Sequence, residues 1–280
     1  FAAVGGGTAW SQARLTGTVR DSSGAVVVGA QVVARNISTG LTTAAQTSSA
    51  GVYSISFLNF GQYELSCELT GFKKFVRSGI VLETGTTTAV DVVLDLGSVS
   101  EVVSVSAATP LLGSESGGIG QLIDNKVILN LPIQSRRGAS LIRLMGNVAF
   151  TSEEGGQANP RFSLAGGRSY NQMWYLDGGA AQNQTNGSPQ LSINPPNESL
   201  QEFKVLANNY PAEYGRSGSG LIAMTTRAGT NDYHGAAYEW LRNDKLNART
   251  FFAPGKAALR YNIFGASLGG PIKKNKTFFF

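Results

Sequence analysis

A glycine-rich stretch at residues 210–235 constrains the fold of this 280-residue chain more than any other feature of its sequence. Its glycines permit left-handed or closely approached backbone that a side chain would forbid. A run of β-forming residues, 221–226, follows the densest part of this stretch directly. The combination is typical of a strand threaded through a confined space, although a glycine-rich hairpin in any β protein has the same pattern.

The composition favours β-structure and narrows the possible functions. The chain is rich in glycine, valine, serine and threonine, only 15% of it is charged, and its length allows two domains with their own cores. The formal net charge is +5, but the only tight basic cluster, Lys273, Lys274 and Lys276, has no accompanying stripe of interleaved aromatic residues. We therefore expect a solvated turn at this cluster and no nucleic-acid partner.

The chain has a single cysteine, Cys67, and a single histidine, His234. One cysteine and one histidine are too few for a disulfide framework or a Cys/His zinc site, and His234 is the only histidine that a catalytic triad could use. No pair of carboxylates stands at a recognisable catalytic spacing. We therefore expect no enzyme, no catalytic residue, no metal and no cofactor. Cys67 alternates in step with Tyr63 and Leu65, which predicts a buried position on the inner face of a strand.

We expect the sequence to be truncated at both ends. Residues 1–13 are small and apolar and close in Ser-Gln-Ala, which fits the remnant of a secretory signal peptide cleaved after Ala13. A disordered leader is the alternative. The other end, residues 276–280, stops inside an expected strand, so we expect a fragment. No apolar stretch reaches the ~18 residues that a transmembrane helix needs.

Residues 14–96 consist of short runs of alternating apolar and polar residues separated by Gly, Asn and Ser turns. This pattern predicts a small seven-stranded β-sandwich. The turns that open at Gly29, Gly51, Gly61 and Gly71, with inward aromatics after them, resemble those of the carboxypeptidase regulatory-like domain. The resemblance implies a domain without an active site of its own, either a carbohydrate- or protein-binding module or a spacer.

Residues 119–229 carry several motifs in a characteristic order. Asp124 is placed to cap a short helix through Leu131 that Pro132 ends, and residues 139–145 are expected to form a second helix. Further along stand Gly166, Gly167, Arg168, Asp177, Gly178, Tyr214, Gly215, Arg216 and Gly220. In this order and spacing the motifs resemble the plug, an α+β domain, of TonB-dependent outer-membrane receptors. The wording at residues 208–210, 242–244, 269–272 and 276–280 resembles that of receptors of the Oar-like type.

Two details refine the resemblance to the plug. The segments 161–169 and 173–179 resemble paired plug strands, and Asp177-Gly178 is by itself a strong turn signal. Ala165, however, stands where the family usually has an arginine. This departure puts in doubt the ion pair between plug and barrel that the arginine supports, for which Arg161 or Arg168 would have to substitute.

Residues 97–118 read as a linker that begins with a β-branched run. By resemblance, this run contains the TonB box, formed by Glu101, Val102, Val103, Ser104, Val105 and Ser106. An extended segment with available backbone N–H and C=O groups can add as a strand to the sheet edge of a partner. The same run could be the closing strand of the sandwich, and the two roles are compatible.

Residues 230–280 are expected to form the first strands of an incomplete transmembrane β-barrel. Two sets of large apolar residues alternate with small or polar ones and are expected to face lipid: Ala236, Tyr238 and Trp240, and Phe264, Ala266 and Leu268. Residues 243–259 would form an extracellular loop, and residues 273–276 a periplasmic turn. A soluble edge hairpin is the alternative.

The leading hypothesis is the N-terminal part of a TonB-dependent outer-membrane receptor that takes up a ligand, with a periplasmic sandwich and a gating plug. The resemblance implies three partners: a TonB-type energy-transducing protein, outer-membrane lipid and an unknown small-molecule or oligosaccharide ligand. Ligand-facing candidates within residues 169–197 are Trp174, Asn183, Gln184 and Asn186. The alternative is a secreted or surface carbohydrate-binding or structural β protein. A hydrolase with a regulatory-like domain is disfavoured by the shortage of histidine and cysteine.

Overall fold

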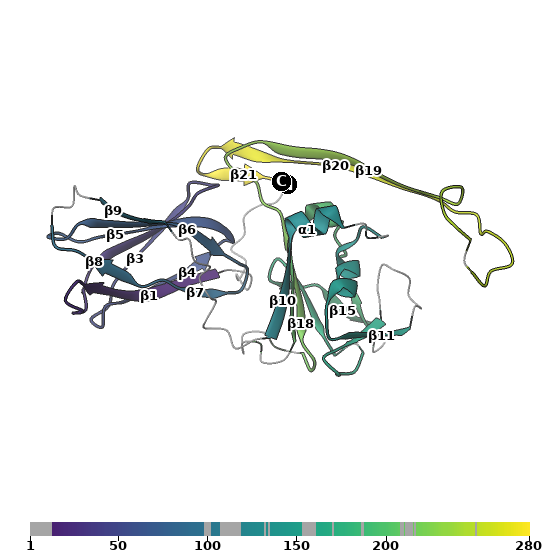
Figure 1. Ribbon diagram of the computed structural model, residues 1–280, viewed down its shortest axis with the longest axis horizontal. Helices are drawn as coiled ribbons and strands as arrows, with labels where there is room; N and C mark the ends of the chain where they lie inside the picture. The colour runs from purple at the N-terminus through teal and green to yellow at the C-terminus, as the bar shows by residue number, and fades with distance from the viewer. Residues whose placement is uncertain are drawn as a thin grey trace. The chain divides into compact units, whose positions relative to one another are not determined.

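The computed structural model describes residues 13–97, 102–106, 119–131, 133, 135–152, 161–169, 171–185, 188–207, 210, 215, 217–249 and 251–280. The chain divides into two compact units, Phe1–Arg227 and Ala228–Phe280. Both units are built mainly from β-strands, which confirms the predicted fold class (Figure 1). Within the described residues, no helix is long and apolar enough to cross a membrane.

The first sheet of the N-terminal sandwich is built around β1 (Ala13–Asp21), which pairs along one edge with β4 (Val52–Leu58). Along its other edge lie two short parallel strands, β7 (Thr87–Ala89) and β8 (Val92–Leu94). Arg14 is paired with Thr87 and Val19 with Val92, so both short strands keep one register along β1. They behave as a single strand with one interruption.

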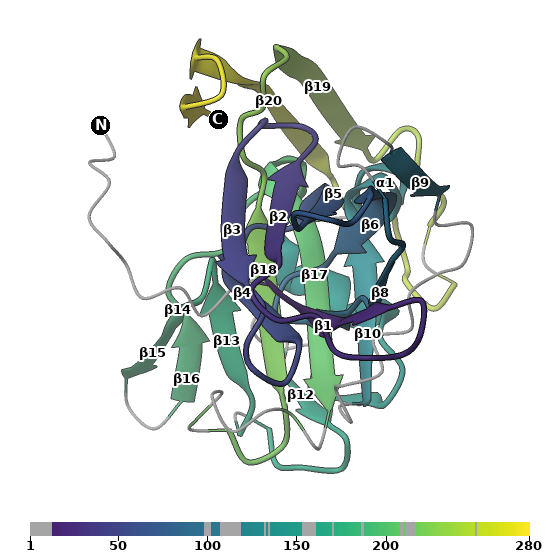
Figure 2. The ribbon, with the colours of Figure 1, turned by 90° about the vertical axis from the view of Figure 1, so that its left-hand side faces the viewer.

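The second sheet of the sandwich has five strands, and their order is β3-β2-β5-β6-β9 (Figure 2). Its strands are β2 (Gln31–Asn36), β3 (Thr42–Gln46), β5 (Gly61–Glu68), β6 (Lys74–Leu82) and β9 (Val102–Ser106). The first four pair in antiparallel fashion, whereas β9 runs parallel to β6. The chain therefore passes through β7 and β8 of the first sheet before it returns to the second.

The core of the sandwich is formed by alternating side chains of the two sheets. Leu15, Ile55 and Leu65 are among its largest fully buried side chains. Burying one such side chain contributes about 1.5–3 kcal/mol. Cys67 is fully buried in this core, which confirms its predicted position, and burial raises the pKa of its thiol to about 12.

The rest of the first unit is organised around a five-stranded sheet in the order β10-β17-β18-β13-β14, called the central sheet below (Figure 2). Its strands are β10 (Ile119–Asp124), β13 (Met173–Leu176), β14 (Gly179–Ala180), β17 (Leu200–Ala207) and β18 (Leu221–Thr226). β17 pairs antiparallel with β10 and β18, whereas β13 runs parallel to β18. Phe203, Ile222 and Met224 of this sheet pack in a second hydrophobic core.

Short helices flank the central sheet. α1 (Asn125–Asn130) begins after Asp124, whose carboxylate accepts the Val127 N–H at 2.9 Å, as predicted for a helix cap. It ends before Leu131, while Pro132 lies outside the described residues. The predicted second helix is present as a 3-10 helix, η1 (Gly138–Leu144). A further 3-10 turn, η2 (Asn197–Ser199), leads into β17.

Two hairpins complete the first unit, and one of them corrects a prediction. β11 (Val148–Ser152) pairs with β12 (Arg161–Leu164), and β15 (Gln182–Thr185) pairs with β16 (Ser188–Leu191). The expected pairing of segment 161–169 with segment 173–179 is wrong, because β12 joins β11 while β13 lies between β14 and β18. A parallel partner comes from a distant part of the chain, so neighbouring segments need not pair.

The second unit contains one sheet in the order β19-β20-β21. β19 (His234–Asn243) and β20 (Arg260–Lys273) form a long antiparallel hairpin, and β21 (Thr277–Phe279) follows a tight turn. In this turn the Lys276 N–H donates to the Lys273 carbonyl oxygen at 3.1 Å. A turn is therefore present where the sequence predicts one.

The register of the β19–β20 hairpin corrects the predicted faces. Tyr238 is paired with Gly265, and Glu239 is paired with Phe264. Directly paired residues project to the same face of a sheet, so Tyr238 and Phe264 project to opposite faces. The expectation that both sets of large apolar residues face lipid is wrong. The sequence shows the alternation within each strand, but it does not show the register between strands.

Candidate functional site

The segment predicted as a TonB box forms strand β9. Its residues Val102–Ser106 are paired one by one with residues 74–78 of β6, in parallel orientation (Figure 1). Glu101, the first residue of the predicted box, lies outside the described residues. The segment is thus a strand of the sandwich's second sheet, which is one of the two roles that the sequence leaves open.

Strand β9 lies at one end of its sheet, and β3 lies at the other. A strand at the end of a sheet presents backbone N–H and C=O groups along one edge to a further strand. Within the described residues, β6 is the only strand paired with β9. The segment can therefore bind another protein by strand addition, in which backbone hydrogen bonds supply affinity and alternate side chains supply specificity.

The loop that follows β6 contacts the central sheet through Thr84. The Thr84 N–H donates to Glu202 Oε2 at 3.1 Å, and the Thr84 carbonyl oxygen accepts from Lys204 Nζ at 3.2 Å. The Thr84 hydroxyl accepts from the Thr225 hydroxyl at 3.2 Å. A single residue of the sandwich is thus bound by side chains from β17 and β18.

Burial at the Thr84 contact shifts the pKa values of both charged side chains. The pKa of Glu202 is raised and that of Lys204 is lowered, in each case chiefly because burial disfavours the charged form. The hydrogen bond that Glu202 accepts from Thr84 opposes the shift of Glu202, and attraction between the two charges opposes both shifts. The contact therefore holds two ionisable groups in a poorly solvated place.

A buried ion pair that the sequence reasoning missed joins the chain after α1 to η2. Arg136 Nη2 and Arg136 Nε lie 2.6 Å and 2.9 Å from Glu198 Oε1. Arg136 Nη1 also donates to the Leu131 carbonyl oxygen at 2.9 Å. No motif pointed to this pair, because the two residues are distant in sequence and neither stands in a recognisable spacing. The pair fixes the start of β17 against the end of α1.

The predicted turn at Asp177-Gly178 is present and is tied to β18. Asp177 and Gly178 have φ values of 49° and 80°, the left-handed pair typical of a two-residue hairpin turn, and they join β13 to β14. Asp177 Oδ1 accepts the Thr226 N–H at 2.8 Å, and Asp177 Oδ2 accepts the Thr226 hydroxyl at 2.9 Å. Aspartate tolerates the left-handed conformation, so one residue shapes the turn and anchors a neighbouring strand.

Glycines of the predicted plug motif serve close backbone approach. Gly220 has a φ of 138°, and a Cβ at this position would lie 2.6 Å from the Leu206 carbonyl oxygen. A Cβ at Gly167 would lie 2.1 Å from the Cβ of Ser219. These residues allow β18 to begin directly against β17. Of the other motif residues, Gly166 (φ 77°), Arg168 and Gly215 are exposed, whereas Tyr214 and Arg216 lie outside the described residues.

The structure corrects one of the predicted ligand-facing residues. Trp174 is only 5% exposed, and its ring centroid lies 6.0 Å from that of Phe162 and 6.5 Å from that of Phe203 in edge-on contacts. Its assignment to a ligand-facing surface is therefore wrong, because β13 turns this side chain into the hydrophobic core. Asn183 and Gln184 lie in β15, and Asn186 lies outside the described residues.

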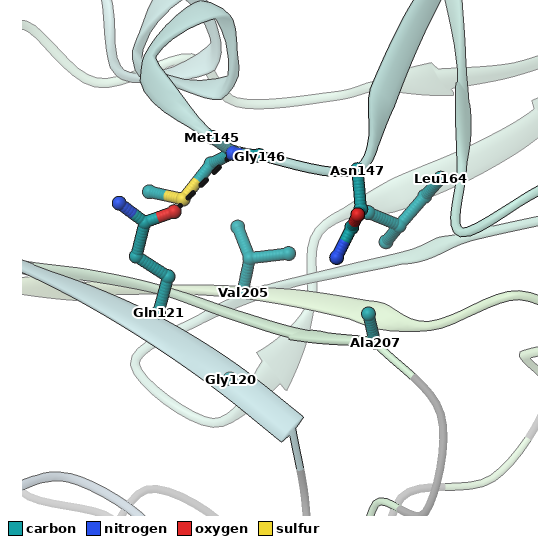
Figure 3. Close-up of a pocket in the computed structure, with 8 residues that line it drawn as sticks. All are labelled: Gly120, Gln121, Met145, Gly146, Asn147, Leu164, Val205 and Ala207. Carbon is teal, nitrogen blue, oxygen red and sulfur yellow. Dashed lines mark hydrogen bonds between the residues drawn. The ribbon is translucent and has the colours of Figure 1, made fainter.

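A cavity of about 300 Å³ lies beside β10 and β17 (Figure 3). Gln121 Oε1 accepts the Gly146 N–H at 3.3 Å and so connects β10 to the loop after η1. Figure 3 shows the Asn147 side chain directed toward Ala207. The lining residues are uncharged: Gly120, Gln121, Met145, Gly146, Asn147, Leu164, Val205 and Ala207. Within the described residues, no cluster of three or more His, Cys, Asp or Glu side chains could hold a metal ion.

Two parts of the chain match known protein families. Residues 14–95 match the carboxypeptidase regulatory-like domain, and residues 225–280 match the outer membrane beta barrel domain. These matches show that the chain contains a carboxypeptidase regulatory-like domain near one end and part of an outer membrane beta barrel domain at the other.

The chain is also similar to the TonB-dependent transporter Oar of Myxococcus xanthus, with 30% identity over 246 residues. The match covers 84% of this chain and 23% of Oar, so the chain spans about a quarter of the length of that relative. The predicted resemblance to TonB-dependent outer-membrane receptors of the Oar-like type is thereby confirmed.

Two solved structures show a weaker likeness to the chain. The transporter YddB from Escherichia coli matches with a TM-score of 0.44 and 16% identity, over 55% of this chain and 24% of that one. The siderophore receptor PirA from Acinetobacter baumannii matches with a TM-score of 0.43 and 16% identity, over 55% of this chain and 22% of that one.

Proposed function

We propose that the chain is the N-terminal part of a TonB-dependent outer-membrane transporter and that residues 101–106 are its TonB box. One observation carries the proposal: Val102–Ser106 forms an extended strand at the end of a sheet. This is the conformation that strand addition by a TonB-type energy-transducing protein requires. The similarity to Oar supports the same function.

In this proposal each part of the chain has its own role. Residues 14–96 form a periplasmic domain, residues 97–118 a linker, residues 119–229 the plug, and residues 230–280 the first strands of the barrel. The family matches near the two ends support this division. The face of the hairpin that carries Leu241, Phe264 and Leu268 lies against lipid, since these side chains are 56%, 80% and 58% exposed. Tyr238 and Trp240 then face the barrel interior.

Transport in this proposal is mechanical and makes or breaks no covalent bond. A small-molecule or oligosaccharide ligand binds from outside, and the energised partner pulls on β9. The pull reaches β10, the end strand of the central sheet, which is held by its ladder with β17. Because Gly120 and Gln121 of β10 line the cavity beside β17, displacing β10 would open that cavity.

The test is binding of the detergent-solubilised chain to the periplasmic domain of a TonB-type protein. Val103→Pro removes a backbone N–H from the segment and should abolish binding. Val103→Thr keeps the N–H and a β-branched side chain, so it should bind as the native chain does. If the folded native chain does not bind, or if Val103→Pro binds as well as Val103→Thr, the segment is not a TonB box.

A further inference from the structure

The ladder between β9 and β6 differs in direction from the other ladders of the second sheet. Every other ladder of the second sheet is antiparallel, whereas β9 is parallel to β6 and arrives from the first sheet by a crossover. Among the described residues, five of this segment, Val102–Ser106, take part in it. Each backbone hydrogen bond of such a short ladder has a small net value, so the ladder is one that a competing strand can replace.

Contacts that do not involve β9 hold strand β6 in the sandwich. Its residues Phe75, Ile80 and Leu82 are buried in the sandwich core, and its other edge is paired with β5 over most of its length. Lys74, at the first paired position, forms an ion pair with Glu68 of β5 at 2.6 Å. Lysine on an edge strand discourages unwanted pairing, so the edge of β6 can be exposed without inviting aggregation.

The strand that holds β9 is also attached to the central sheet. β6 ends one residue before Glu83, and the next residue, Thr84, is bound by Glu202, Lys204 and Thr225. The edge that carries β9 is therefore anchored to β17 and β18 rather than to the sandwich alone. While β9 is paired with β6, a force applied to β9 would act on the contacts of Thr84 and not on the linker that leads to β10.

We propose that the sandwich is a holder for the recognition strand: β6 and the TonB-type partner compete for Val102–Ser106, and the partner binds only after β9 has left β6. This inference rests on the proposed function and adds a role for the N-terminal domain. In the held state, β6 covers one edge of β9 and the partner is not bound. In the released state, the covalent linker carries the pull to β10.

The experiment locks β9 to β6 with a reversible disulfide between Val76→Cys and Ser104→Cys. The two positions are directly paired, and neighbouring strands lie about 4.8 Å apart, within the Cα separation that a disulfide spans. Val76 follows the buried Phe75, so its side chain projects away from the sandwich core. The native Cys67 needs no replacement, because burial raises the pKa of its thiol to about 12.

The expected result is that the oxidised double variant binds the periplasmic domain at least tenfold more weakly than the same protein after reduction, which binds like the native chain. The single variants Val76→Cys and Ser104→Cys should show no redox dependence. Equal affinity of the oxidised and reduced forms would contradict the proposed competition between β6 and the partner. The partner would then bind to the outer edge of β9 while β9 stays paired with β6.

Two further outcomes are distinguishable from these. If the disulfide does not form in the folded chain under mild oxidation, as judged by thiol labelling after unfolding, the pairing of β9 with β6 is contradicted and the holder is overturned. If the disulfide forms but neither the native chain nor the reduced variant binds the partner, residues 101–106 are not a TonB box. The role proposed for the sandwich is then contradicted as well, because no partner competes with β6 for β9.

Discussion

Arg136 Nη2 lies 2.6 Å from Glu198 Oε1, and the two side chains are only 2% and 8% exposed. Removing one member of a buried pair leaves an uncompensated charge, which typically costs about 3–5 kcal/mol. We therefore expect Arg136→Met and Glu198→Gln to lower the free energy of unfolding by this order. The double change Arg136→Met with Glu198→Leu should cost clearly less. Urea unfolding followed by tryptophan fluorescence measures all three, and equal losses in single and double variants would contradict the pair.

The contact at Thr84 makes stability depend on pH through Glu202. Its folded-state pKa is raised above the ordinary value of 4.5, so its contribution to stability is fully present below pH 4.5 and is lost as the pH rises through the raised pKa. Relative to Glu202→Gln, the native chain should therefore lose free energy of unfolding as the pH increases from 4.5. Urea unfolding at a series of pH values tests this, with Glu239→Gln at an exposed position as the control. Parallel curves for native and Glu202→Gln chains would refute it.

The turn at Asp177 should be sensitive to the loss of its carboxylate. Asp177→Ala removes the acceptors of two hydrogen bonds from Thr226 and places alanine at a φ of 49°. We expect a loss of about 2 kcal/mol or more in the free energy of unfolding. Asp177→Asn keeps an acceptor and tolerates the left-handed backbone, so it should lose less than half as much. Thermal or urea unfolding measures both losses, and equal losses in the two variants would contradict the roles of both the acceptor and the left-handed backbone.

Gly220 should tolerate a methyl group poorly. Gly220→Ala places a Cβ 2.6 Å from a backbone carbonyl oxygen at a φ of 138°, so we expect a loss of more than about 2 kcal/mol. Gly146→Ala is the matched control, because a Cβ at that position meets nothing within 4 Å, and its effect should stay within about 0.5 kcal/mol. The free energy of unfolding of the two variants measures the difference, and similar values would contradict the close approach.

If the β19–β20 hairpin lies in the outer membrane as proposed, its register predicts which of two neighbouring residues meets water. Ala266 shares a face with Phe264 and Leu268, whereas Ser267 shares a face with Gly265 and is paired with Ala236. With the former face against lipid, a cysteine at position 267 should react with a water-soluble maleimide in intact outer membranes. A cysteine at position 266, at nearly the same depth, should not. The reverse pattern would reverse the assignment of the two faces.

The features that the sequence predicted correctly are those with a local cause. Asp124 caps α1 because a side-chain oxygen three residues before an N–H suffices, and Asp177-Gly178 forms a turn because both residues tolerate a positive φ. The buried position of Cys67 followed from alternation along one strand. Each of these signals lies within a few residues of the feature that it predicts.

The features that the sequence did not reveal depend on contacts between distant segments. Alternation placed Tyr238 and Phe264 on a regular face of each strand, but only the ladder between the strands shows that these faces differ. Trp174 was expected to face a ligand, but β13 pairs in parallel with the distant β18, and the Trp174 side chain is buried in the second hydrophobic core. The pairing of Arg136 with Glu198, and of β9 with β6, likewise needs the folded chain.

Cys67 is the only thiol of the chain, and the packed sandwich surrounds it completely. A protein bound for the outer membrane crosses an oxidising compartment, where an accessible thiol forms disulfides with other chains. The closure of the first domain is therefore what protects the newly exported chain from covalent dimerisation. A disulfide-linked dimer recovered from the cell envelope would mark those molecules whose sandwich had not yet folded.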